Sequence, residues 1–279
     1  LRNYVRMVTG GYSNLLMLDA KGGLGKTYHV IDTLQEEYEN DDMWVHQKGF
    51  TTPIELYKTL WKARHPDGTL FLDDMSGVTN NQKAIDMLKA ATETNGDENW
   101  IQYRTSRDIE HPFIDGETLP NTFCFRGSIV ISFNDTPDNH HFDALRDRGI
   151  DYHMSFTYQE RLEIVSKLAE QENFSELTVE KQRDTAEWIS QVTDSSFDVT
   201  IRTFEEVLDM RQFAEDAGEN WQKMAYEIFN MDYQKHRIIE MREEADMTVE
   251  EQVDVWCNEF NKSESSYYNK LSEVKSERM

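Results

Sequence analysis

The chain has 279 residues, which is long enough for one large domain or for a medium domain with a smaller one. Hydrophobic residues make up 38% and aromatic residues 11%, so apolar surface is available for a buried core, and a wholly disordered chain does not fit. Aspartate and glutamate number 53 against 29 lysines and arginines, and the formal net charge of -24 argues against a general nucleic-acid coat protein.

The sequence predicts neither a membrane span nor a secreted product. It has no run of about 18 apolar residues, and its first residues lack the apolar stretch of a signal peptide. Cys124 and Cys257 stand far apart without a CxxC spacing, which fits a reducing compartment. We therefore expect a cytoplasmic protein with no membrane partner, located in the host cytoplasm if it is viral.

Apolar runs and helical patterns alternate up to about residue 155. The expected strands are 14–18, 43–46, 69–72, 128–133 and 152–156, and the expected helices between them are 27–39, 54–63 and 82–94. Such alternation is typical of a parallel sheet covered by helices.

From Tyr158 onward the strand signals fade and apolar residues recur at helical spacing, over 161–171, 179–192 and 200–214. The segment from about Tyr233 is polar and predicted helical, with a weak apolar stripe, and is interpreted as a solvated helix or a partner-binding arm. The predicted organisation is an α/β domain at 1–157, a small all-helical domain at 158–232 and an acidic helical tail at 233–279.

The strongest local signal is a glycine-rich loop that follows the first predicted strand and opens the first predicted helix. Glycines let backbone N–H groups face a phosphate, Lys26 reaches the outer phosphates, and the Thr27 hydroxyl is placed to hold Mg²⁺. Ala20 stands where the pattern GxxxxGK[ST] has its first glycine, and this requires a negative φ at Ala20. The predicted nucleotide-binding residues are Ala20, Lys21, Gly22, Gly23, Leu24, Gly25, Lys26, Thr27 and Tyr28.

A second signal is the apolar stretch 69–72, which ends in two acids, Asp73 and Asp74. Successive side chains at a strand end diverge, so one carboxylate can lie next to a metal and the other toward an attacking water. Asp73 is predicted to hold Mg²⁺ through water, and Asp74 to polarise the nucleophilic water. The alternative is a strand that simply ends in an Asp-Asp turn.

Two further features lie downstream of these acids. The apolar strand 128–133 ends at Asn134, which can orient water or touch the γ-phosphate, or can be an ordinary turn residue. Arg146 and Arg148 precede the last predicted strand, and an arginine there can reach the nucleotide of a neighbouring subunit, or can form surface ion pairs with carboxylates.

Together, these motifs and their order resemble those of AAA+ ATPases, which belong to the P-loop NTPases, over about residues 10–215. Several strings, such as 84–91 and 119–127, are similar to small AAA+ proteins encoded by tailed phages. The resemblance implies a P-loop NTPase sheet in the first domain and a lid in the helical domain. It also implies that ATP and Mg²⁺ are the cofactors.

The resemblance also implies a role for individual residues. Lys26 and Thr27 match the phosphate-loop pair, Asp73 and Asp74 the metal-binding and catalytic acids, and Asn134 the first sensor. Arg148 matches the arginine finger, with Arg146 in reserve. Arg202 resembles the second-sensor arginine of the lid, and its alternative is a helix-surface arginine paired with Glu205 or Glu206.

Residues 95–127 interrupt the alternation at the place where some AAA+ groups carry a hairpin before the first sensor. Trp100, Tyr103, Arg104 and Arg107 suit base stacking and phosphate contact. The alternative is an ordinary loop whose aromatic side chains pack on the domain.

The resulting hypothesis is a Mg²⁺-dependent ATPase that works as a AAA+ motor or remodelling enzyme on a protein or DNA substrate, encoded by a phage or other virus. A homo-oligomeric ring formed in the presence of ATP is the expected assembly. The alternative is a nucleotide-dependent switch or adaptor that binds partners with little hydrolysis.

Overall fold

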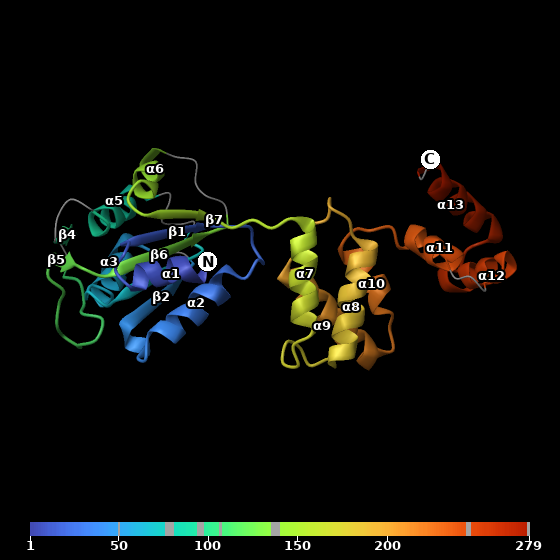
Figure 1. Cartoon of the computed structure of the whole chain (residues 1–279), viewed down its shortest axis with the longest axis horizontal. Helices are drawn as coiled ribbons and strands as arrows, with labels where there is room; N and C mark the ends of the chain where they lie inside the picture. The colour runs from blue at the N-terminus through green and yellow to red at the C-terminus, as the bar shows by residue number, and fades with distance from the viewer. Residues whose placement is uncertain are drawn as a thin grey trace. The chain divides into compact units, whose positions relative to one another are not determined.

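The computed structural model describes residues 1–49, 51–75, 81–93, 98–105, 108–134, 140–243 and 247–277. It divides into two compact units, Leu1–Thr157 and Tyr158–Met279 (Figure 1). We describe each unit by itself.

The first unit is built on a five-stranded sheet in which every neighbouring pair of strands is parallel. The strand order is β2-β3-β6-β1-β7, and the strands are β1 (Leu15–Asp19), β2 (Trp44–Lys48), β3 (Thr69–Asp73), β6 (Ser128–Phe133) and β7 (Ile150–His153). Strands β3 and β6 are buried along their whole length, as expected for a parallel sheet covered on both faces. The predicted fold class is therefore confirmed. The last strand, expected at 152–156, ends at His153, because its pairing with β1 stops where β1 ends at Asp19.

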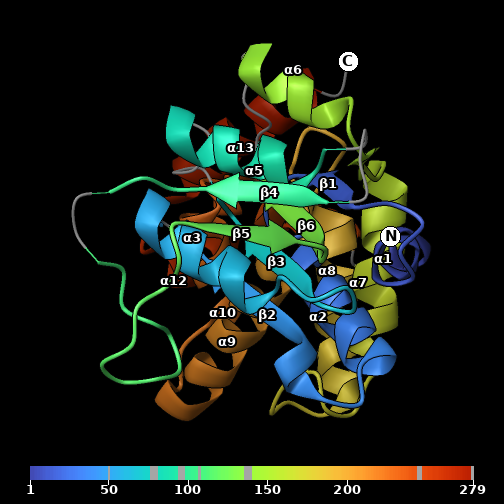
Figure 2. The same cartoon turned by 90° about the vertical axis from the view of Figure 1, so that its left-hand side faces the viewer.

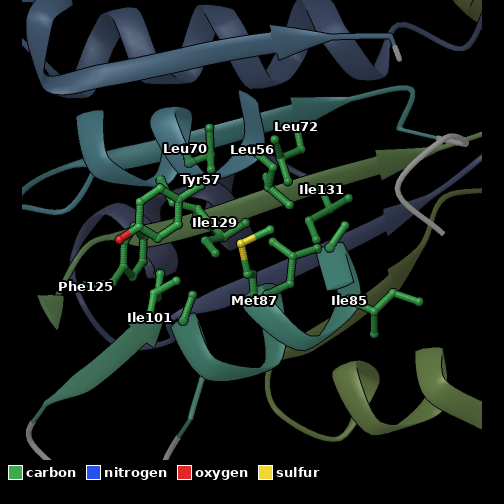
Figure 3. Close-up of a cluster of buried hydrophobic side chains, with 14 of the residues drawn as sticks. Leu56, Tyr57, Leu70, Leu72, Ile85, Met87, Ile101, Phe125, Ile129 and Ile131 are labelled. Carbon is green, nitrogen blue, oxygen red and sulfur yellow. The ribbon is translucent and has the colours of Figure 1, made fainter. Parts of the chain in front are cut away.

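Helices cover both faces of this sheet, and the alternation along each strand decides which residues meet which helices. On one face Leu16 and Leu18 of β1 pack with α1 (Arg2–Thr9) and α2 (Lys26–Glu37). On the other face Leu15 and Met17 pack with α3 (Pro53–Lys62), α5 (Gln82–Ala91) and α6 (His140–Arg146). Figure 3 shows this second cluster, with Leu56 of α3 and Met87 of α5 lying over the strands.

Residues 95–127 contain two short antiparallel strands, β4 (Asn99–Gln102) and β5 (Thr122–Phe125), which lie side by side in Figure 2. Ile101 and Phe123 are buried, and the Phe123 ring contacts Tyr57 of α3 at 5.0 Å between ring centroids. Trp100, on the opposite side of β4, is 57% exposed. The pair of strands is therefore attached to the sheet domain by one face only.

Over its described residues, the regular elements of the second unit are all helices, namely α7 (Tyr158–Ala169), α8 (Val179–Val192), α9 (Ile201–Ala217), α10 (Trp221–Ile228), α11 (Tyr233–Glu243), α12 (Val249–Phe260) and α13 (Glu264–Glu277). The helices α7 to α10 share a core that includes Trp188, Phe204 and Tyr226. Across the part of the chain that the structure describes, no helix is both long and apolar enough to cross a membrane.

The tail differs from the single polar helix or arm that its composition suggests. Helices α11, α12 and α13 bury a cluster of their own around Trp256 and Tyr267. Gln252 is buried within this cluster, where its amide donates to the Met241 carbonyl at 3.0 Å and accepts from the Tyr267 hydroxyl at 2.6 Å. The tail is thus a small packed three-helix element.

Candidate functional site

The predicted site residues follow three neighbouring strands of the sheet, β1, β6 and β3. Because these strands are parallel, their carboxyl ends lie at the same edge. The register pairs Asp19 with Phe133 and Leu72 with Ile131, so Asp73 lies beside Ser132. The glycine-rich loop, the two acids and Asn134 are therefore brought together by the strand order.

The loop after β1 has the backbone that its glycines predict. Gly23 and Gly25 adopt left-handed φ angles of 75° and 79°, which glycine reaches without strain. Gly25 is the N-cap of α2, so the amino end of that helix opens into the loop. Ala20 is 1% exposed and is not among the described residues with positive φ, so the requirement stated for this position is met.

Lys26, the first residue of α2, is 7% exposed and turns its ammonium group back into the loop. Its Nζ donates to the carbonyls of Ala20 and Lys21, the latter at 3.0 Å, and to Oδ1 of Asn134 at 3.0 Å. A buried ammonium needs such partners. The contact with Asn134 joins the loop after β1 to the end of β6.

Asp73 is 2% exposed and accepts hydrogen bonds from three other elements. The Thr27 hydroxyl lies 3.0 Å from both carboxylate oxygens, the Ser132 hydroxyl donates to Oδ1 at 2.7 Å, and His46 Nε2 of β2 lies 3.4 Å from Oδ2. Burial raises the pKa of Asp73, but the hydrogen bonds from His46, Ser132 and Thr27 lower it by more, so the net pKa lies below the ordinary value. The carboxylate is therefore ionised at neutral pH.

Asp74 is exposed and has a left-handed φ of 55°. Its amide donates to the Ser132 hydroxyl at 3.2 Å, and its Oδ1 accepts from Nδ2 of Asn134 at 2.9 Å. Asn134 thus uses the oxygen of its amide for Lys26 and the nitrogen for Asp74. The two acids of the pair lie in different surroundings, one buried and the other exposed.

The oxygen ligands and the ammonium group in this region fit Mg²⁺ and a phosphate chain. Mg²⁺ takes hard oxygen ligands and is usually held by one or two protein oxygens together with water and phosphate. The Thr27 hydroxyl and the ionised Asp73 carboxylate are such oxygens, 3.0 Å apart. The neighbouring ammonium of Lys26 supplies the positive charge that a phosphate requires.

The arginines are placed differently from these residues. Arg148 is half-buried and donates from Nε to the Ala144 carbonyl at 3.1 Å and from Nη1 to the Lys89 carbonyl at 2.5 Å. Arg146 pairs with Asp143 at 3.3 Å. Their role as arginine fingers remains a prediction.

Arg202 and Tyr28 are both exposed. Arg202 lies near the start of α9 in the second unit, and Tyr28 on α2 is 65% exposed. The roles of both residues also remain predictions. Arg107, predicted to contact phosphate, lies outside the described residues.

Two members of the hydrogen-bonded group were missed by sequence reasoning, Ser132 and His46. The signal for Ser132 is a polar residue inside the otherwise apolar run of β6, two positions before Asn134. His46 is in β2 at the sheet edge, and its ring stacks on Phe71 at 4.9 Å between centroids. Its sequence neighbours give no comparable signal.

Comparisons with known proteins gave matches of structure only. No protein-family model matches the sequence, and no curated protein sequence does. A point mutant of RuvB from Thermotoga maritima is 16% identical with a TM-score of 0.48, covering 98% of this chain and 85% of that one. Domain III of the replication initiation protein DnaA from the same organism is 16% identical with a TM-score of 0.47, covering 81% of this chain and 88% of that one. The DNA clamp loader delta protein of Bacillus subtilis is 10% identical with a TM-score of 0.37, covering 100% of this chain and 73% of that one.

Proposed function

We propose that this protein is a AAA+ ATPase that binds ATP with Mg²⁺ at the edge of the sheet formed by β1, β3 and β6, and hydrolyses it. The observation that carries the proposal is the convergence of predicted residues from separate segments. Thr27 lies 3.0 Å from Asp73, Lys26 3.0 Å from Asn134, and Asn134 2.9 Å from Asp74. A loop that merely ended a strand would not require these contacts.

Each residue then has a role that follows from its position. Lys26 neutralises the outer phosphates, and Thr27 and Asp73 hold Mg²⁺. The ion, when bound, polarises the phosphate oxygens and offsets their negative charge. Exposed Asp74 accepts a hydrogen bond from the attacking water, and Asn134 orients that water beside the γ-phosphate.

We further propose that residues 1–157 form the nucleotide-binding domain, that 158–232 act as its lid with Arg202 facing the phosphates, and that 233–279 are an accessory element. Tyr28 belongs to the nucleotide-binding surface in this proposal, and Arg148 acts on the nucleotide of an adjacent subunit. Because Arg148 would then complete the site of another subunit, we expect an oligomeric ring that forms with ATP. The narrower likeness to phage-encoded proteins, and a protein or DNA substrate, stay predictions.

Phosphate release from ATP tests the proposal. The wild-type protein is expected to release phosphate in the presence of Mg²⁺ and to stop when the metal is chelated. Lys26→Ala should abolish release, while Lys21→Ala should reduce it far less, because Lys21 is exposed and the substitution keeps the backbone carbonyl that contacts Lys26. Equal turnover in the wild type and in Lys26→Ala would contradict the proposal.

The alternative, a nucleotide-dependent switch, predicts tight ATP binding with negligible turnover. The same assay separates the two when it is repeated with single-stranded and duplex DNA. Stimulation by DNA indicates a motor that works on nucleic acid. ATP binding without turnover under all these conditions indicates the switch.

A further inference from the structure

We propose that Ser132 is a positioning residue that holds both acids of the site in their working geometry through a single hydroxyl group. This inference rests on the proposed ATPase function and assigns a role to a residue outside the sequence motifs. Ser132 is 0% exposed, so it acts through Asp73 and Asp74 and does not touch the substrate.

The direction of the two hydrogen bonds at Ser132 is fixed by the chemistry of its partners. The amide of Asp74 can only donate, and it does so to the Ser132 oxygen at 3.2 Å. The ionised Asp73 carboxylate can only accept, so the one hydroxyl proton of Ser132 goes to Oδ1, at 2.7 Å. The chain of donors therefore runs from the Asp74 backbone through Ser132 to Asp73.

The first bond determines where the Asp74 carboxylate points. A left-handed φ of 55° is unfavourable for a residue with a side chain, although Asp adopts it more readily than most. The hydrogen bond from the Asp74 amide to Ser132 favours this conformation, from which Oδ1 accepts the Asn134 amide. Without the hydroxyl, the amide loses its partner and Asp74 can relax to a negative φ, which moves its carboxylate.

The second bond determines the orientation of the Asp73 carboxylate. Ser132 holds Oδ1 from the β6 side, while His46 approaches Oδ2 from the β2 side. These two contacts fix the orientation of the Asp73 carboxylate, and in this orientation both of its oxygens lie 3.0 Å from the Thr27 hydroxyl. Partners of this kind around a metal ligand typically change metal affinity or activity by about 10–100-fold when removed.

The chain offers a matched control on the same strand. Ser128 opens β6, is 5% exposed, and donates its hydroxyl to the Val8 carbonyl at 2.9 Å. Replacing Ser128 by Ala also deletes a buried hydrogen bond that a serine hydroxyl donates. Ser128 is at the start of β6, whereas the two acids contact Ser132 near the opposite end of that strand.

The experiment measures kcat, KM for ATP and the Mg²⁺ concentration for half-maximal turnover in the full-length protein. Ser132→Ala is expected to lower kcat by about 10–100-fold and to raise the Mg²⁺ requirement, while the affinity for ATP measured without metal changes little. Ser128→Ala should keep kcat and the Mg²⁺ requirement near wild type. Ser132→Thr, which retains a hydroxyl, should recover most of the turnover, and thermal unfolding confirms that each variant is folded.

A double variant separates positioning from a general loss of stability. If Ser132 works by placing the acids, adding Ser132→Ala to Asp74→Asn should lower kcat much less than it lowers the wild-type kcat. Fully additive losses would overturn the inference, as would wild-type kcat and Mg²⁺ dependence in Ser132→Ala. A wild-type protein without turnover would contradict the proposed function itself, so the two failures are distinguishable.

Discussion

The two adjacent carboxylates at the end of β3 illustrate how position decides the chemistry of a residue. Asp73 is 2% exposed and its pKa is held low by three hydrogen bonds, which suits a permanent metal ligand. Asp74 is exposed and has a left-handed backbone, which turns its side chain toward Asn134. Asp adopts this backbone more readily than Glu, so the shorter acid at this position agrees with the geometry.

Much of this site could be predicted from sequence, because it obeys local rules. A glycine-rich loop between a strand and a helix predicts Lys26 and Thr27, and polar residues directly after apolar strands predict Asp73, Asp74 and Asn134. Ser132 and His46 could not be predicted in the same way. Their roles depend on which strands are neighbours and on a register that only the folded sheet specifies.

A pH-dependent stability is expected from a single histidine of the second unit. His236 lies half-buried on α11 with its ring 5.1 Å from that of Tyr226, and burial lowers its pKa below the ordinary 6.5. Lys235 lowers the pKa further, while Asp232 and Glu240 raise it without reversing the shift. The unfolded chain therefore binds the proton more readily than the folded one, so this contribution to stability is complete above about pH 7.5 and falls as the pH drops through 6.5.

Urea unfolding at pH 7.5 and 5.5 measures this effect. The wild-type protein should lose stability over this interval, and His236→Gln should lose less. His65→Gln is a suitable control, because His65 is exposed and lies in the other unit. An identical pH dependence in the wild type and in His236→Gln would contradict the assignment.

At the scale of elements, the turn at the start of β6 is tightly constrained. A Cβ added at Gly127 would lie 2.1 Å from the Ala63 carbonyl oxygen and 2.7 Å from that of Gly68. Backbone hydrogen bonds hold this approach on both sides, from Arg126 to the Arg64 carbonyl and from Ser128 to the Gly68 carbonyl. Since Ser132 lies in β6 and Asn134 directly follows it, the turn sets the position of the site.

Gly127→Ala is accordingly expected to lower the free energy of unfolding by about 2–3 kcal/mol, because backbone atoms must move to admit the methyl group. Gly116→Ala is the control: its φ is 79°, and nothing lies within 4 Å of the added Cβ, so only conformational strain of about 1 kcal/mol is expected. Urea unfolding of both variants gives the comparison. Equal losses would show that the close approach at Gly127 does not limit stability.

The elements that sequence patterns missed are those whose apolar residues are few or discontinuous. The weak apolar stripe of the tail, at Val249, Val253, Trp256 and Phe260, favoured a solvated helix or a partner-binding arm, yet Val249 is 53% exposed and Trp256 is 1% exposed. The core of the tail is completed by Tyr267 and Leu271 of α13. Periodicity within one segment cannot reveal a core that is shared among three short helices.

For the whole molecule, we propose that an arginine acts between subunits. Arg148 is anchored in its own chain by two backbone carbonyls, so it is held in a fixed orientation near the end of α6. Arg148→Ala should retain ATP binding and lower kcat by roughly 10³-fold, as expected for loss of an arginine finger. Arg146→Ala, which removes ion pairs with Asp143 and Asp151, should have a much smaller effect.

Mixing two inactive variants tests whether Arg148 acts in trans. Lys26→Ala supplies an intact Arg148, and Arg148→Ala supplies an intact phosphate loop, so mixed oligomers should recover part of the turnover. Unfolding of each variant is measured alongside, because Arg148 also bonds to its own backbone. A mixture that stays inactive while both proteins are folded and assembled, or an active monomeric Arg148→Ala, would contradict the shared site.

The central claim is that the loop from Ala20 to Thr27 binds the triphosphate of ATP together with Mg²⁺. Isothermal titration of the full-length protein with a non-hydrolysable ATP analogue, with and without Mg²⁺, measures this binding directly. We expect saturable binding of one nucleotide per chain, stronger with Mg²⁺ and at least about tenfold weaker in Lys26→Ala, equivalent to about 1.4 kcal/mol. Absence of measurable binding to the wild-type protein, or equal affinity in Lys26→Ala, would contradict it.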